Sequence, residues 1–252
     1  MNWGKMICVV GLLGVFFSIH VDATPLLQQE AAQHYEEKEY GQARQLYQQL
    51  DQIYPNHPAI LYNMGNAAFK QGHLGHAIAY YKSARRLSPR DEDIRFNLNK
   101  AQSSVIDTTQ GDDPFLAALF FYVLDALSVN EWYLFLLSML TAFCMSLYRV
   151  YRGPWRHQFG TVLLAFLLPF SILFCFFFSR LHRDYLSDQA IAIQKKVAVK
   201  AGPSMALPTL FFVHEGVVFQ IKSNQASWSE IQLRNGFKGW VHASDYQRLG
   251  IH

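Results

Sequence analysis

Two long apolar blocks stand out in the pattern of hydrophobic and polar positions along the chain. They cover residues 132–148 and 159–179, and neither contains an Asp, Glu, Lys or Arg. A helix rises about 1.5 Å per residue, so roughly 17 to 25 apolar residues cross the hydrocarbon core of a bilayer. The pattern predicts a transmembrane hairpin over residues 131–180. The alternative is a pair of helices buried in a soluble core, but soluble helices of this length rarely lack every charged side chain.

The distribution of basic residues predicts the orientation of this hairpin. The connecting loop, residues 149–158, carries three arginines, whereas the chain between Lys100 and Arg149 has no Lys or Arg. By the positive-inside rule the loop faces the cytoplasm, and the polar segments before and after the hairpin lie outside. Arg180 and Arg183, just after the second block, weakly favour the opposite orientation.

The N-terminus has the pattern of a secretory signal peptide. Lys5 precedes an apolar run at residues 6–19, which ends at Val21-Asp22-Ala23, a small-residue pattern typical of cleavage sites. We expect residues 1–23 to be a signal peptide; whether it is removed or kept as an anchor, the chain from Thr24 onward is exported. These patterns predict a membrane protein with both polar segments outside the cytoplasm, which in a bacterium means an inner-membrane protein with both segments in the periplasm.

Residues 58–91 have the internal periodicity of a helical repeat. Small residues fall where two antiparallel helices would touch, and Pro89 would end the second helix. The segment resembles the tetratricopeptide repeat, with matching positions at Leu61, Met64, Gly65, Gly72, Ala77, Tyr81, Ala84 and Pro89. A weaker copy covers residues 24–57 and a capping helix covers residues 92–106, so we expect an α-helical solenoid over residues 24–110.

The first helix of each pair lines the inner, concave surface of such a solenoid. There we expect side chains suited to an extended peptide, because amides pair with its backbone, rings take its side chains and lysines hold a carboxylate. These candidate residues are Tyr35, Tyr62, Asn66, Phe69, Lys70 and Lys100. The alternative for Tyr62 and Phe69 is packing against the neighbouring helix, and for the lysines it is exposure to solvent alone.

Residues 111–130 are expected to hold a linker and an interfacial helix. A polar stretch at residues 103–113 leads to Pro114, and the apolar stretch that follows is interrupted by Asp125 and Ser128. This stretch is too short and too polar at its end to span alone, which favours an amphipathic helix on the outer leaflet. The alternative is a tilted extension of the first span.

From residue 190 the pattern changes to short alternating runs separated by turn residues, which is typical of β-strands. Five runs, at residues 190–193, 196–200, 217–221, 228–233 and 239–242, predict a small all-β barrel over residues 190–250. The segments VKAGPS, FFVHEG, WSEIQL and NGFKGWV resemble the bacterial SH3-like family, which implies binding of peptides or cell-wall fragments. We expect Trp240 in the core and Trp228 as a partly exposed ligand contact.

The sequence contains no constellation typical of catalysis, so we expect a protein that is not an enzyme and has no cofactor or metal. His73 and His76 lie three residues apart without a further ligand nearby, and we expect His214 and Glu215 to make a structural hydrogen bond in the SH3-like turn. Of the three cysteines none lies in an exported polar segment, and the net charge of +3 gives no basis for nucleic-acid binding.

The order of segments, from signal peptide through repeats and membrane hairpin to an SH3-like barrel, resembles the BatE-type proteins of bacterial aerotolerance (Bat) operons. The resemblance implies a multi-domain membrane adaptor with von Willebrand A-domain membrane proteins and a MoxR-type ATPase as partners, acting in stress tolerance or envelope maintenance. The modules themselves favour a scaffold that gathers protein partners. The alternative is a cell-wall sensor whose barrel contacts peptidoglycan.

Overall fold

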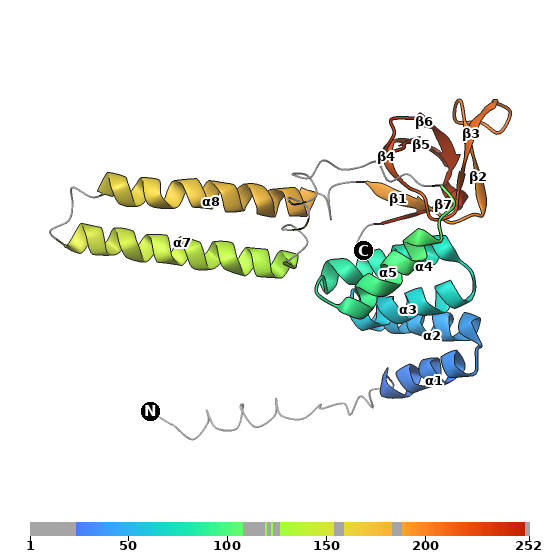
Figure 1. The fold of residues 1–252 in the computed structure, drawn as a ribbon, viewed down its shortest axis with the longest axis horizontal. Coiled ribbons are helices and arrows are strands. Elements are labelled where there is room, and N and C mark those ends of the chain that lie inside the picture. Colours follow the sequence, from blue (N-terminus) through green and yellow to red (C-terminus); the bar gives the residue numbers. More distant parts are fainter. Residues whose placement is uncertain are drawn as a thin grey trace, which may run out of the picture.

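The computed structural model describes residues 24–107, 119, 122, 127–153, 159–182 and 188–249. Figure 1 shows a stack of short helices, a curled β-sheet beside it, and a pair of long helices that projects from these two. The expected signal peptide at residues 1–23 and most of the expected linker and interfacial helix at residues 111–130 lie outside the described residues. Both therefore stay predictions.

The helical module consists of α1 (Thr24–Glu36), α2 (Tyr40–Ile53), α3 (Pro58–Lys70), α4 (Leu74–Leu87) and α5 (Glu92–Ser103). Each helix packs against the next one along the chain. Helices α3 and α4 approach closely because Gly65 has no side chain, and a Cβ there would lie 2.6 Å from the ring of Tyr81. Asp91 caps α5 by accepting a hydrogen bond from the Ile94 N–H. The predicted helical repeat region is confirmed.

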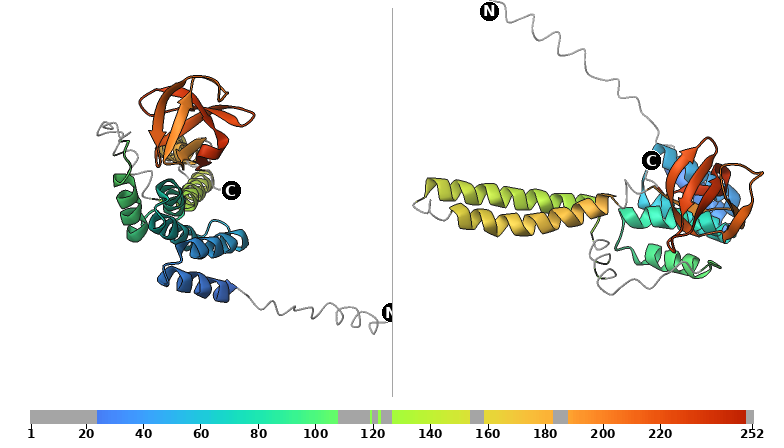
Figure 2. Two further views of the ribbon diagram at one scale, coloured as in Figure 1. Left: turned by 90° about the vertical axis from the view of Figure 1, so that its right-hand side faces the viewer. Right: turned by 90° about the horizontal axis from the view of Figure 1, so that it is seen from above.

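The β module is one antiparallel sheet with strand order β3-β2-β6-β5-β4-β1-β7, and it curls on itself (Figure 2). Val199 and Val241 lie in its fully buried interior. The expected small all-β domain, separate from the repeats, is confirmed. The strands are β1 (Gln189–Ala192), β2 (Lys196–Lys200), β3 (Thr209–His214), β4 (Val218–Gln225), β5 (Trp228–Gln232), β6 (Lys238–His242) and β7 (Tyr246–Arg248).

The alternation of polar and apolar residues predicts five strands and misses β3 and β7. On β3, Leu210 and Phe212 are 54 % and 49 % exposed although their neighbours Phe211 and Val213 face the interior, so both faces of the strand are apolar. A strand with two apolar faces has no period of two for the sequence to reveal. Strand β7 has three residues, too few to show a period at all.

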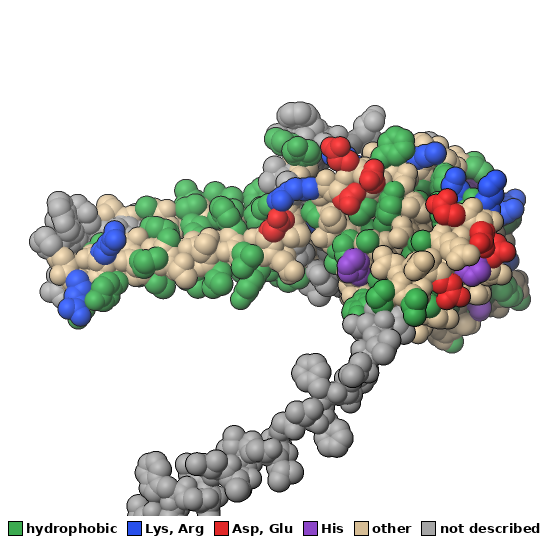
Figure 3. Space-filling view, turned by 90° about the horizontal axis from the view of Figure 1, so that it is seen from below, with side chains coloured by type: hydrophobic (Ala, Val, Ile, Leu, Met, Phe, Trp, Pro, Cys, Tyr) green, Lys and Arg blue, Asp and Glu red, His purple; other side chains and the backbone are tan. Residues whose placement is uncertain are grey.

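The two long helices, α7 (Val129–Arg152) and α8 (Phe159–Leu181), lie side by side in both ribbon figures. Their rings interlock: Trp132 stacks on Phe176 with 6.0 Å between centroids, and Phe143 lies 5.4 Å from Phe166. Ser128 begins α7 through a capping box with Glu131. Figure 3 shows apolar side chains along the outer surface of this pair, with charged ones at its ends.

Among the described residues, one helix, Asn130–Arg152, is long and apolar enough to cross a membrane, and α8 contributes a shorter apolar stretch, Ala165–Leu181. Two side chains before that stretch, at positions 162 and 164, lie outside the description. The structure therefore supports one candidate span, and the two-span hairpin stays a prediction.

Candidate binding surfaces and the junction of the two modules

The concave face of the helical module carries a network of hydrogen bonds among its own side chains. Asn66 Oδ1 accepts from the Tyr81 hydroxyl at 2.7 Å and from Asn97 Nδ2 at 3.1 Å, and Asn97 Nδ2 also donates to the Tyr62 hydroxyl at 2.8 Å. Tyr62 and Asn66, both expected to contact a peptide, thus tie α3 to α4 and α5. Their contact with a ligand stays a prediction.

Tyr81 is the buried anchor of this network, with 1 % of its surface exposed. Burial raises the pKa of its hydroxyl, and the nearby Tyr62 and Tyr35 act in the same direction. The hydroxyl therefore remains a neutral hydrogen-bond donor to Asn66 over the whole physiological pH range.

The solvent-exposed part of the concave face has lysine side chains next to aromatic side chains. Lys70 and Lys100 are exposed, and Lys100 Nζ lies 5.7 Å from the centroid of the half-buried Phe69 ring. Tyr35 is half-buried and makes an edge contact with Tyr40 at 5.3 Å. An ammonium group beside a ring suits a ligand that carries a carboxylate next to an apolar side chain.

The two tryptophans of the β module have the reverse of the expected exposures. Trp228 is 8 % exposed and makes an edge contact with His242 at 5.4 Å, whereas Trp240 is half-buried. The expectation of a partly exposed Trp228 is wrong because its cross-strand partners, Gln225 and His242, flank it on both sides. Trp240 is the more accessible ring.

The turn between β3 and β4 docks onto the helical module. Glu215 Oε1 accepts a hydrogen bond of 2.9 Å from the Gly75 N–H in the first turn of α4. The His214 N–H donates to Asp107 Oδ2 at 2.7 Å, and His214 Nδ1 lies 2.9 Å from Asp107 Oδ1. A carboxylate is favourable at a helix N-terminus, where N–H groups lack acceptors within the helix. The sequence places these hydrogen bonds within the β module, and the structure places them across the junction.

Two glycines allow the modules to approach each other closely at this junction. A Cβ on Gly75 would lie 2.2 Å from the carbonyl oxygen of Ala192, and one on Gly216 would lie 2.6 Å from Val105 Cγ2. Ile191 and Leu249 of the β module belong to the same cluster of buried side chains as the core of the helical module. The two modules thus share a continuous apolar core, which no pattern along the chain predicts.

A cleft of about 860 Å³ lies beside the junction. Residues from α4 and α5 line one side, and residues from β1, β4 and the end of β5 line the other. Its polar lining combines five amides and two cations with one carboxylate: Asn99, Gln102, Gln189, Gln220, Gln232, Lys82, Arg234 and Asp107. No motif in the sequence predicts this cleft, because its residues come from segments far apart in the chain.

Comparison with known proteins identifies both modules. Residues 34–95 match the tetratricopeptide repeat model, and residues 194–245 match the bacterial SH3 domain model. The chain joins tetratricopeptide repeats to a bacterial SH3 domain. A search of curated proteins finds no match to the chain. Gly75 falls in the first matched range and Glu215 in the second, so the junction connects the two domains.

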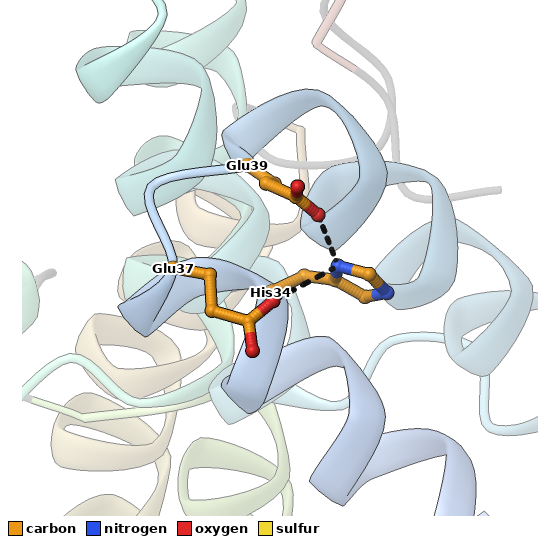
Figure 4. A group of neighbouring side chains, drawn as sticks. All are labelled: His34, Glu37 and Glu39. Atoms are coloured by element: carbon orange, nitrogen blue, oxygen red, sulfur yellow. Dashed lines mark hydrogen bonds and ion pairs between the residues drawn. The ribbon is translucent and has the colours of Figure 1, made fainter.

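Outside the junction, the turn between α1 and α2 of the repeats gathers three side chains that can offer metal ligands (Figure 4). His34 Nδ1 lies 2.6 Å from Glu39 Oε2 and 3.9 Å from Glu37 Oε2. The two glutamates are nearly half exposed, and His34 and Glu39 are joined by a short hydrogen bond across the turn. This cluster stabilises the turn; the expectation that the protein uses no metal stays a prediction.

Proposed function

We propose that this protein is a non-enzymatic adaptor of the bacterial inner membrane, which presents its repeats and its SH3 domain on the periplasmic side to assemble protein partners. One observation carries the proposal: two domains of binding families are docked on each other at one end of the paired long helices (Figure 1). Because docking fixes the distance between the two binding domains, partners held on them experience a raised effective concentration.

The junction also bears on membrane topology. Gly75 and Asp107 precede the long helices in sequence, and their partners Glu215 and His214 follow them. Domains in contact occupy the same side of a membrane, so the chain between them crosses an even number of times or not at all. This parity supports the proposed hairpin, and the three arginines of the loop at residues 149–158 support placing that loop on the cytoplasmic side.

The repeats also contact the base of the helix pair. Arg90, in the turn between α4 and α5, lies 3.0 Å from Glu131 in the first turn of α7. This ion pair supports a position of the repeats at the membrane surface, where their concave face meets partners that are themselves in the membrane. The resemblance to BatE-type proteins suggests von Willebrand A-domain proteins and a MoxR-type ATPase complex as those partners.

Photo-crosslinking in cells tests the adaptor role. A benzoylphenylalanine at position 70, on the concave face, should give discrete protein adducts that a probe at the exposed position 49 of α2 does not give. The adducts should weaken when Lys100 is changed to Glu, since the charge reversal removes a carboxylate contact. Identical adducts at both positions, or none at position 70, would refute a concave binding face.

The orientation has its own test. Alkaline phosphatase is active only outside the cytoplasm, so its fusion after residue 249 should be active and its fusion within residues 149–158 should be inactive. The opposite pattern would place both domains in the cytoplasm and end the periplasmic proposal.

Cell-wall binding is the second candidate, favoured by the match to the bacterial SH3 domain family. Detergent-solubilised full-length chain should then co-sediment with purified sacculi. Absence of retention would leave the adaptor role as the better proposal.

A further inference from the structure

The cleft between the two domains has the size of a ligand site. Its volume of about 860 Å³ lies inside the range of roughly 300 to 1,000 Å³ that ligand pockets occupy. Both domains contribute walls, since Asn99 and Gln102 belong to α5 and Gln220 and Gln232 belong to the sheet. Such a site exists only while the domains are docked.

The sheet wall of the cleft carries a row of amide side chains. Gln189 pairs with Gln220 across β1 and β4, and Gln220 pairs with Gln232 across β4 and β5. Cross-strand partners point to the same face of a sheet, so the three glutamines are adjacent. Each amide offers two N–H donors and an acceptor, which is the complement of a peptide backbone. Asn99 and Gln102 repeat this chemistry on the helical wall.

The charged residues of the cleft favour an anionic ligand. Lys82 lies on the helical wall and Arg234 on the sheet wall, and Asp107, which contacts His214, is the one carboxylate among the described lining residues. Lys222 adds a further cation at the edge of the cleft, where its Nζ donates to Gln220 Oε1 at 2.7 Å. A guanidinium and ammonium groups in one cleft bind carboxylates.

The aromatic lining argues against a sugar as the ligand. Within the described part of the chain, the only aromatic side chain in the lining is Phe219, which is 2 % exposed and packed in the core of the SH3 domain. A ring that is buried cannot stack on the apolar face of a sugar. The rows of amides and the cations together fit a polypeptide in extended conformation.

We propose that the cleft between the repeats and the SH3 domain binds a short acidic peptide, with each domain supplying one wall. The site is separate from the concave face of the repeats, which is lined by Lys70 and Lys100. Gly216 and Asp107 belong both to the cleft and to the junction, so binding requires docked domains. A substitution that weakens the junction, such as Gly75→Ala, should weaken binding without touching the lining.

The test uses the full-length protein in lipid nanodiscs and a phage library of random heptapeptides. Selected peptides should be rich in Asp and Glu. Charge changes on either wall, Asn99→Glu and Arg234→Glu, should each weaken their binding at least about tenfold, which corresponds to 1.4 kcal/mol. Both positions are exposed, so neither change should disturb folding. Lys195→Glu, an equally exposed charge reversal between β1 and β2 of the SH3 domain and outside the cleft lining, is the matched control and should leave affinity within about twofold.

A double variant separates this site from the proposed adaptor face. Peptides of the cleft should keep their affinity for Lys70→Glu/Lys100→Glu. If every selected peptide loses binding to that double variant but binds Asn99→Glu normally, the cleft proposal fails while the concave face is supported. A selection without acidic peptides, or equal binding to the wall variants and the wild type, overturns the cleft proposal as well.

Discussion

Gly41 and Gly75 occupy equivalent places in the two repeats, which makes a sharp test of the junction possible. Each is the second residue of its helix, α2 or α4. Around Gly41, a new Cβ would meet only the end of the flexible Gln71 side chain, at 3.1 Å, whereas at Gly75 it would lie 2.2 Å from the backbone oxygen of Ala192. The same change to Ala should therefore have opposite effects at the two positions.

The magnitude follows from the contacts. In a helix, Gly→Ala is favourable by up to about 1 kcal/mol, less near an end. An unstrained C···O contact is roughly 3.3 Å, so the methyl group added at position 75 would displace the SH3 domain by about 1 Å. That movement breaks the hydrogen bond from position 75 to Glu215, and a hydrogen bond to a charged group contributes about 1.5–3 kcal/mol. We expect Gly75→Ala to weaken docking by about 2 kcal/mol and Gly41→Ala to be neutral or stabilising.

Hydrogen exchange of the full-length protein in nanodiscs measures this difference. In Gly75→Ala, amides of the first turn of α4 should exchange about 30-fold faster than in the wild type, since 1.4 kcal/mol corresponds to a factor of ten. Protection in Gly41→Ala should be unchanged. Wild-type protection at α4 in Gly75→Ala, or equal loss in both variants, would show that the domains do not dock through this contact.

Three further outcomes are expected. Gly216→Ala should lower the thermal unfolding temperature more than Gly236→Ala. Both glycines have φ near +90°, but only Gly216 faces Val105. Equal shifts would mean that backbone strain alone accounts for the loss of stability. Burial, with help from nearby cations, lowers the pKa of His76, so the unfolded chain takes up a proton at higher pH than the folded one. Stability should therefore be complete above the ordinary pKa of histidine and should fall as the pH drops through it. In His76→Gln, the melting temperature should depend less on pH between about pH 7.5 and 5. An unchanged dependence on pH would contradict this. Arg90→Ala should change stability by less than about 1 kcal/mol, since its ion pair is exposed; a larger loss in chemical unfolding would contradict a merely superficial contact.

The features that the sequence predicts well are those encoded by a local period. Small residues such as Gly65 and Ala77 mark helix contacts within one repeat, and the runs around Val197 and Val199 alternate as strands do. Strand β3 escapes this reasoning because Phe212 is apolar yet faces outward. Apolar residues that face outward remove the alternation of polar and apolar positions from which a strand is predicted.

The junction is invisible to local patterns for a different reason. Gly75 and Glu215 are 140 residues apart, and His214 and Asp107 are 107 apart. A motif search recognises the His214-Glu215 turn but contains nothing about its partners. The concave-face residues show the same limit. Their residue types are compatible with a polar ligand, but they are equally compatible with the internal hydrogen-bond network that Asn66 and Tyr62 form.

The shared core has a practical consequence for dissecting this protein. Ile191 and Leu249 are buried against side chains of α4 and its neighbours, so a fragment ending after α5 would leave part of that core bare to water. The repeats expressed alone would then be an aggregation-prone fragment. Any interaction detected with that fragment would reflect the newly exposed apolar surface. Fragments cut at the ends of the family matches would therefore divide the hydrophobic core that the two domains share.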